Sequence, residues 1–160
     1  MELEIRFSQE CDFNQLVELD HRIWSATTTP ATIHWKSVSE FSNRNPAGSQ
    51  VVALVDGEVV GYLGFHASTP LETNQHVMEL DIGVDEAFQG KGIGKSLLAK
   101  AKEVAIDRGI HKLSIRVLAT NEGAIQFYRH VGFIDQGRLI DEFFINGRYV
   151  DDLLMYLLLK

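Results

Sequence analysis

Residues 84–96 read VDEAFQGKGIGKS, in which three glycines stand at alternate positions, Gly90, Gly92 and Gly94. Glycine lets a backbone pass close to a ligand and point successive N–H groups in one direction. Apolar side chains follow at helical spacing from Ile93 onward, so the loop leads into a helix N-terminus, which attracts anions. The stretch predicts either a phosphate-binding loop or a glycine-rich turn that only caps a helix.

Two nucleotide-binding patterns resemble this stretch, and neither is complete. The P-loop pattern G-x-x-x-x-G-K-[ST] matches Gly94-Lys95-Ser96 but requires a glycine where Gln89 stands. The dinucleotide pattern G-x-G-x-x-G requires a glycine at Lys95 or at Leu97. A nucleotide hydrolase is therefore disfavoured, although the glycines still suit a ligand that carries phosphates.

Length and composition are those of a soluble globular protein. The chain has 160 residues, of which 45% are hydrophobic and 23% charged, so we expect one domain spanning residues 1–160. No signal peptide and no apolar run of about 18 residues is evident, which predicts a cytoplasmic protein without a membrane partner. Cys11 is the single cysteine, and we expect it to be a packed, inert thiol. No metal-binding spacing is present, so no metal is expected.

Charge is unevenly distributed along the chain. Residues 89–116 contain seven basic and two acidic residues, a net charge of +5, which leaves −12 for the remainder of a chain whose net charge is −7. A basic segment beside the glycine loop suits a small polyanionic ligand, and it also suits a solvated helix face. The acidic remainder argues against a nucleic-acid partner and is compatible with a cationic substrate.

Hydrophobic periodicity and turn residues predict alternating strands and helices. Strands are expected at residues 3–7, 51–55, 59–66, 77–84, 112–118, 133–145 and 148–158, and helices at 8–24, 33–41, 93–108 and 120–130. The dipeptides Asp56-Gly57 and Asn146-Gly147 are strong hairpin signals. The order β-α-α-β-β-β-α-β-α-β-β predicts an α/β (α+β) protein with one mixed sheet and helices on both faces.

Two separated segments resemble the signatures of one enzyme superfamily. Residues 84–94 are similar to the acyl-CoA signature V-x-x-x-x-[QR]-x-x-G-x-[GA] of the GNAT superfamily of N-acetyltransferases. Residues 121–133 are similar to its second signature, N-x-x-A-x-x-x-Y-x-x-x-G-F, and residues 149–155 resemble the ending of many bacterial members. The resemblance implies the GNAT fold along the whole chain: a mixed, mostly antiparallel sheet of about seven strands with helices on both faces.

The resemblance also implies that acetyl-CoA is the cosubstrate. The N–H groups of residues 89–95 would hold the pyrophosphate of coenzyme A. The pantetheine arm would pair with residues 82–84, where the Val84 N–H would polarise the thioester carbonyl as an oxyanion-hole donor. The cofactor-binding residues implied in this way are Ile82, Gly83, Val84, Gln89, Gly90, Lys91, Gly92, Ile93, Gly94, Lys95, Asn121, Ala124, Phe127 and Tyr128.

Two residues are predicted to be catalytic. Tyr128 lies two helical turns after Asn121, and the resemblance makes it the general acid that protonates the CoA thiolate; from its apolar neighbours alone it would be a core aromatic. Glu79 stands where similar proteins often carry an acidic residue that accepts the amine proton through water, and Asp81 shares its strand face. Both carboxylates also suit a half-exposed strand surface.

The acceptor is predicted least sharply. Family analogy places the acceptor pocket at the first helices, their loop and the last hairpin, with the candidates Trp24, Thr27, Thr28, Trp35, Tyr149 and Asp152. The two tryptophans also suit a hydrophobic core. Further carboxylates would make this side acidic and favour a cationic amine: Asp20, Asp141, Glu142 and Asp151. The six histidines show no ligand spacing and receive no role.

The expected function is direct transfer of the acetyl group from acetyl-CoA to a primary amine, most simply a small cationic molecule. The alternatives are a protein N-terminal or lysine acetyltransferase and a non-catalytic acyl-CoA-binding regulatory module. Arg116 stands five residues before Asn121, where some ribosomal-protein acetyltransferases of the superfamily carry a glutamate, and this departure counts against that subgroup. A homodimer is possible by analogy with similar proteins.

Overall fold

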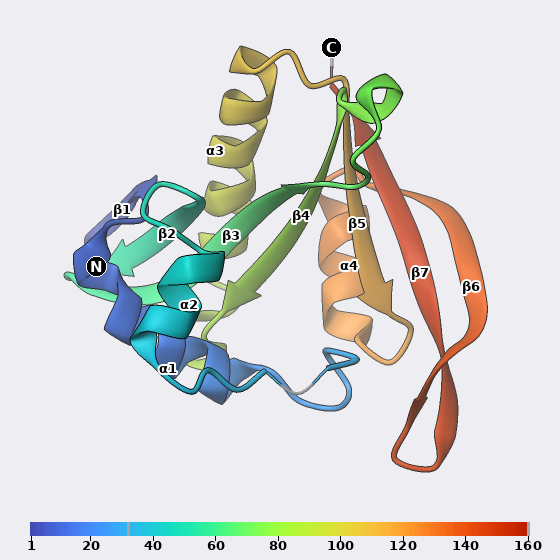
Figure 1. The fold of residues 1–160 in the computed structure, drawn as a ribbon, viewed down its shortest axis with the longest axis horizontal. Coiled ribbons are helices and arrows are strands. Elements are labelled where there is room, and N and C mark those ends of the chain that lie inside the picture. The colour runs from blue at the N-terminus through green and yellow to red at the C-terminus, as the bar shows by residue number, and fades with distance from the viewer. Residues whose placement is uncertain (32, 160) are drawn as a thin grey trace. The chain divides into compact units, whose positions relative to one another are not determined.

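The computed structural model describes residues 1–31 and 33–159. Along the chain, which Figure 1 colours from blue to red, the elements are β1 (Leu3–Phe7), α1 (Phe13–Ile23), α2 (Val38–Arg44), β2 (Gln50–Val55), β3 (Glu58–Ala67), β4 (Val77–Val84), α3 (Ile93–Asp107), β5 (Lys112–Leu118), α4 (Glu122–His130), β6 (Ile134–Ile145) and β7 (Arg148–Leu158). Three 3₁₀ turns are also present: η1 (Glu10–Asp12), η2 (Glu72–Asn74) and η3 (Glu86–Phe88). The predicted order of strands and helices is confirmed.

The seven strands form one mixed sheet in the order β1-β2-β3-β4-β5-β7-β6. Strands β4 and β5 are parallel, whereas β1/β2, β2/β3, β5/β7 and β6/β7 are antiparallel. The sheet is therefore mostly antiparallel, as the resemblance implied. Within the chain two compact units are distinguished: unit 1 comprises residues 1–23, 33–65 and 81–107, and unit 2 comprises residues 24–32, 66–80 and 108–160.

Unit 1 is built around β2, in which all six residues are buried. Helix α1 packs on α2, and α3 packs on β1 and β2. The fully buried side chains include Leu16 and Leu19 from α1, Phe41 from α2, and Leu97 from α3. Burying large apolar side chains of this kind stabilises a fold by roughly 1.5–3 kcal/mol each. This core fixes the strand and helix between which the glycine loop runs.

Unit 2 is dominated by the ladder of β5, β7 and β6. Strand β5 pairs with β7 from Lys112–Leu158 to Leu118–Asp152. Strands β6 and β7 form a long ribbon that closes at Asn146 and Gly147, whose φ angles of 51° and 77° match the predicted hairpin turn (Figure 1). The register of β6 shifts twice, between Asp135 and Gly137 and between Leu139 and Phe143. Most side chains of β6 are exposed.

Three local expectations differ from the structure. The first helix begins at Phe13 instead of residue 8, because the Asp12 carboxylate accepts hydrogen bonds from the Gln9 N–H and from Arg6 and holds residues 10–12 as a 3₁₀ turn. The second helix spans Val38–Arg44 instead of 33–41, because the Ser37 hydroxyl accepts from the Glu40 N–H at 3.1 Å and caps it there. Cys11 is exposed, not packed.

Across residues 1–31 and 33–159, none of the helices combines the length and the apolar character that crossing a bilayer requires.

Candidate functional site

The glycine loop of unit 1 turns at two left-handed positions. Gly90 has a φ of +77° and Gly92 a φ of +81°, and a Cβ atom built on either would meet nothing within 4 Å. These glycines are therefore required for the backbone conformation and not for close packing, because L-residues adopt this region at a cost of about 1–2 kcal/mol. Both are exposed, so the loop presents its backbone to solvent.

Helix α3 begins directly after this turn. Its first intrahelical hydrogen bond runs from the Ser96 N–H to the Gly92 carbonyl at 3.0 Å. The N–H groups of the preceding residues 93–95 belong to the first turn and have no intrahelical acceptor. Gly92 and Lys95 are exposed, so this 15-residue helix opens its N-terminus toward solvent on the side of the loop. Such a terminus can bind a phosphate group.

The approach to the loop is held by Asp85. Its carboxylate accepts from the Ala87 N–H at 3.0 Å and from the Arg22 guanidinium at 2.7 Å, and its own N–H donates to the Val60 carbonyl at 2.8 Å. The Gln89 side chain donates to the Val84 carbonyl at 3.3 Å. The chain between β4 and the loop is thereby tied to α1 and β3, which are parts of the same unit.

The end of β4 in unit 1 lies close to β3 because two β3 residues lack side chains. A Cβ atom at Gly61 would lie 3.1 Å from the Gly83 carbonyl oxygen, and one at Gly64 would lie 3.0 Å from the Asp81 carboxylate oxygens. Residues 82–84, predicted to pair with pantetheine, therefore sit on a strand whose position depends on these glycines. The sequence interpretation did not single out Gly61 or Gly64.

In unit 2 the second signature forms α4. The Asn121 side chain accepts from the Ala124 N–H at 3.3 Å and so caps this helix. Tyr128 is 7% exposed, and its ring packs edge-on against Phe127 at 5.4 Å and against Phe133 at 5.5 Å between ring centroids. Asn121 and Tyr128 thus have structural roles, and their predicted roles toward acetyl-CoA remain predictions.

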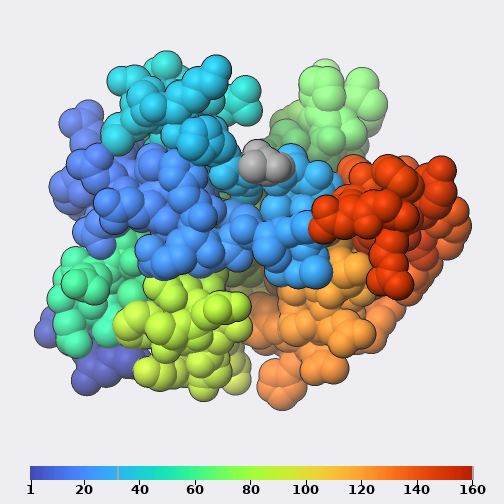
Figure 2. Space-filling view, turned by 90° about the horizontal axis from the view of Figure 1, so that it is seen from below, coloured from blue at the N-terminus to red at the C-terminus, as the bar shows by residue number. Residues whose placement is uncertain are grey.

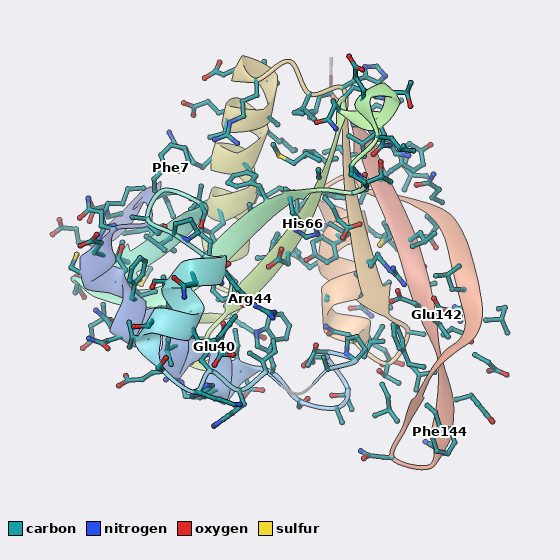
Figure 3. All side chains as sticks on the ribbon, in the orientation of Figure 1. Phe7, Glu40, Arg44, His66, Glu142 and Phe144 are labelled. Atoms are coloured by element: carbon teal, nitrogen blue, oxygen red, sulfur yellow. The ribbon has the colours of Figure 1, made fainter. Side chains whose placement is uncertain are left out.

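Two clusters of polar side chains lie on the strands of unit 2. His66 at the end of β3 (labelled in Figure 3) and Glu79 of β4 form a hydrogen bond of 2.7 Å between Nε2 and Oε2. Arg116 of β5 donates from Nε to the Asp152 carboxylate at 2.6 Å and from Nη2 to Glu142 at 3.4 Å. The hydrogen bond from His66, with the positive charge of Arg116, holds the pKa of Glu79 below its usual range despite partial burial.

The six acceptor candidates have different surroundings. In the 25–30 loop of unit 2, the Thr28 hydroxyl accepts from the Ser25 N–H at 2.9 Å, and the Thr27 carbonyl accepts from the Thr120 hydroxyl at 2.8 Å. Trp24, in the same unit, is half-buried. Trp35 belongs to unit 1, where its indole N–H donates to the buried Asp20 carboxylate at 2.8 Å.

The remaining two candidates lie on β7. Tyr149 is exposed near the tip of the β6/β7 hairpin, the red region facing the viewer in Figure 2, and its ring packs edge-on against Phe144 at 5.0 Å. Asp152 is buried at 3% exposure against Arg116. The carboxylates on this ribbon are partly neutralised, since Asp151 also pairs with Arg138 at 2.7 Å. The ribbon, residues 134–158, contains five carboxylates and two arginines, Arg138 and Arg148, a formal charge of −3. Pairing with Arg116 and Arg129 from outside the ribbon reduces this charge to −1, so the ribbon remains weakly acidic.

The sequence interpretation missed His66 because its partner lies on another strand, 13 residues away. Spacing patterns detect ligands that share a helix face or a loop, and they do not detect a pair formed by strand pairing.

Comparison with known proteins agrees with the two signatures. The profile of the acetyltransferase (GNAT) family matches residues 12–133. Spermidine N(1)-acetyltransferase of Escherichia coli K12 is 30% identical over 154 residues, covering 91% of this chain and 76% of that protein. The enzyme of the same name from Vibrio cholerae is 37% identical over 81 residues, 50% of this chain and 47% of that protein.

Solved structures share the fold. A protein from Streptococcus mutans superposes with a TM-score of 0.90 at 30% identity, covering 98% of this chain and 99% of that one. A phosphinothricin acetyltransferase from Sinorhizobium meliloti, solved in complex with acetyl-CoA, has a TM-score of 0.87 at 24% identity over 99% of this chain and 89% of that one. The chain belongs to the GNAT family of acetyltransferases.

Proposed function

We propose that this protein transfers the acetyl group of acetyl-CoA directly to a primary amine of a small, cationic molecule. The observation that carries the proposal is the exposed turn at Gly90 and Gly92 leading into the N-terminus of α3, in a chain of the GNAT family. The turn and helix supply backbone donors for a pyrophosphate without any side-chain charge. Acetyl-CoA in a solved family structure supports the choice of ligand.

The cationic acceptor is supported by charge and by the relatives. The β6/β7 ribbon keeps an excess of carboxylates after its ion pairs are counted, which attracts a cation. Two relatives are named for acetylation of spermidine, a small polyamine. The second class of acceptor is a protein N-terminus or a lysine side chain, and it is tested by measuring turnover with peptide substrates.

The residues of this chain would share the chemistry as follows. The Val84 N–H polarises the thioester carbonyl, Tyr128 donates a proton to the departing thiolate, and the His66–Glu79 pair takes a proton from the amine. No covalent acetyl-enzyme and no metal are required by this scheme. Among residues 1–31 and 33–159, there is no group of three or more histidine, cysteine, aspartate or glutamate side chains that could hold a metal ion.

A thiol-release screen tests the proposal. Acetyl-CoA is supplied with polyamines, amino sugars, amino acids and short peptides, and free thiol is measured. Turnover with polyamines above all other classes is expected. Turnover with peptides alone would replace the small-molecule acceptor by a protein acceptor, and CoA binding by calorimetry without any thiol release would indicate a regulatory acyl-CoA-binding module.

A further inference from the structure

The hydrogen bond between His66 and Glu79 joins an exposed imidazole to a less exposed carboxylate. The side chain of His66 is 49% exposed and that of Glu79 is 25% exposed, and 2.7 Å separates Nε2 from Oε2. Histidine exchanges its proton near neutral pH, whereas a carboxylate does so near pH 4. The pair therefore combines a half-exposed imidazole with a less exposed anion that orients it.

The surroundings decide which member holds a proton. Glu79 accepts from the ring and also lies in the field of Arg116, and both effects keep its carboxylate ionised. An ionised carboxylate of low proton affinity is a poor acceptor for an ammonium proton, because a general base works best when its pKa lies near the operating pH. The same anion favours the protonated ring beside it, so uptake of a proton by the pair near neutral pH belongs to the imidazole.

We infer that His66 is the group that removes the proton from the acceptor amine, and that Glu79 is the positioning residue that holds the ring through Nε2. This inference rests on the proposed acetyl transfer, and it gives Glu79, which the sequence predicts to be the base, a positioning role instead. It assigns a function to a histidine that no motif indicates.

The proton balance of the step is complete. The ammonium form of the acceptor gives one proton to His66 and becomes a nucleophilic amine. Its nitrogen forms the C–N bond with the acetyl carbon while the C–S bond breaks. When the amide forms, the nitrogen loses its second proton, which returns to the Tyr128 phenolate left after Tyr128 has protonated the thiolate. His66 releases its proton to solvent before the next turnover.

Other charged groups surround the pair. On β5, the positive charge of Arg116 helps to lower the pKa of Glu79, and its guanidinium is itself bound to Asp152 of β7 and Glu142 of β6. On β4, Asp81 follows Glu79 at the next position of the same strand face, and its carboxylate occupies the space beside Gly64. These groups shift the midpoint of the pH profile without changing its sign: activity rises with pH as the ring becomes neutral.

Two conservative variants separate the two roles. His66→Gln keeps an amide donor for Glu79 but cannot titrate, and Glu79→Gln keeps an oxygen that accepts from Nε2–H but carries no charge. If His66 is the base, His66→Gln lowers kcat by about 10²–10⁴-fold and removes the rise of kcat near neutral pH that the imidazole causes. Glu79→Gln should then lower kcat less than His66→Gln does and should move the rise to lower pH. Imidazole added to His66→Ala should restore part of kcat.

The opposite pattern would overturn the inference: near-normal turnover and an unchanged pH profile in His66→Gln, with loss of turnover in Glu79→Gln, would make Glu79 the base. Calorimetric binding of CoA by both variants controls for folding. An NMR titration of the His66 ring needs no acceptor, and its midpoint should move to lower pH in Glu79→Gln. If the midpoint of the His66 titration does not move, the coupling between His66 and Glu79 is refuted. If the midpoint moves but the unaltered protein releases no thiol from acetyl-CoA, the proposed acetyl transfer is refuted and the coupling of the two residues is retained.

Discussion

Gly92→Ala tests the glycine loop most directly, because the chain contains a matched control. Gly92 and Gly57 have φ angles of +81° and +85°, and a Cβ atom at either would meet nothing within 4 Å. Gly57 lies in the hairpin turn between β2 and β3, in the same unit as the loop. Alanine therefore causes the same kind of backbone strain at both positions, but only Gly92 precedes the N-terminus of α3.

The magnitudes follow from that geometry. A left-handed L-residue costs about 1–2 kcal/mol, which for a chain of this length lowers the melting temperature by roughly 2–8 °C in both variants. If the loop relaxes to relieve the strain, one N–H donor to the pyrophosphate is lost. A hydrogen bond to a charged group contributes about 1.5–3 kcal/mol, so the Kd for CoA should rise roughly 10–150-fold in Gly92→Ala and remain unchanged in Gly57→Ala.

Calorimetric titration with CoA and thermal unfolding of both variants provide the measurements. Equal affinity in Gly92→Ala and Gly57→Ala, at equal loss of thermal stability, would refute the argument that the backbone at Gly92 binds phosphate. Loss of affinity in both would indicate that general destabilisation, and not the loop, controls binding.

Three further predictions concern stability. Asn121→Ala should lower the unfolding free energy in urea by about 1 kcal/mol through loss of the α4 cap, and Asn121→Ser should retain most of it; an equal loss in both would contradict the capping role. Arg116→Leu leaves the Asp152 carboxylate buried without its cation and should cost up to about 3 kcal/mol, whereas Arg116→Leu combined with Asp152→Leu should recover part of that loss in the same urea assay. Burial opposes ionisation of Asp12, but hydrogen bonds from Arg6 and the Gln9 N–H outweigh it and hold its pKa below the ordinary 3.8. This stabilisation is present above pH 3.8 and is lost as pH falls through the lower pKa of the folded state. The difference between the unfolding free energies at pH 7 and pH 2 should therefore be smaller in Asp12→Asn than in the unaltered protein.

Strands were predicted from sequence more accurately than helix starts. The bounds 77–84, 112–118 and 148–158 agree with β4, β5 and β7 because alternating or continuous apolar residues end there at turn residues. The starts of α1 and α2 were misplaced because each is decided by one side chain, Asp12 or Ser37, that accepts a backbone N–H. Several polar residues near each helix could have done so, and periodicity does not choose among them.

The glycine loop could be predicted because its conformation is local. A turn with two left-handed residues favours glycine at both positions independently of the tertiary structure. Gly90 and Gly92, which both have positive φ angles, can therefore be recognised from the sequence alone. The two clusters, His66 with Glu79 and Arg116 with Asp152, depend instead on which strands become neighbours. Arg116 and Asp152 are 36 residues apart, and the pairing of β5 with β7 brings them together.

The two register shifts of β6 have a consequence for association between molecules. β6 is the last strand of the sheet, and its outward side chains include Ile134, Ile140 and Phe144, a combination that invites a second chain to extend the sheet. The shifts, together with the left-handed Asp141 between Ile140 and Glu142, interrupt the row of backbone donors and acceptors that such an added strand would need. The irregular edge thus guards the protein against fibril-like stacking, and a dimer formed at β6 would have to rely on contacts between side chains.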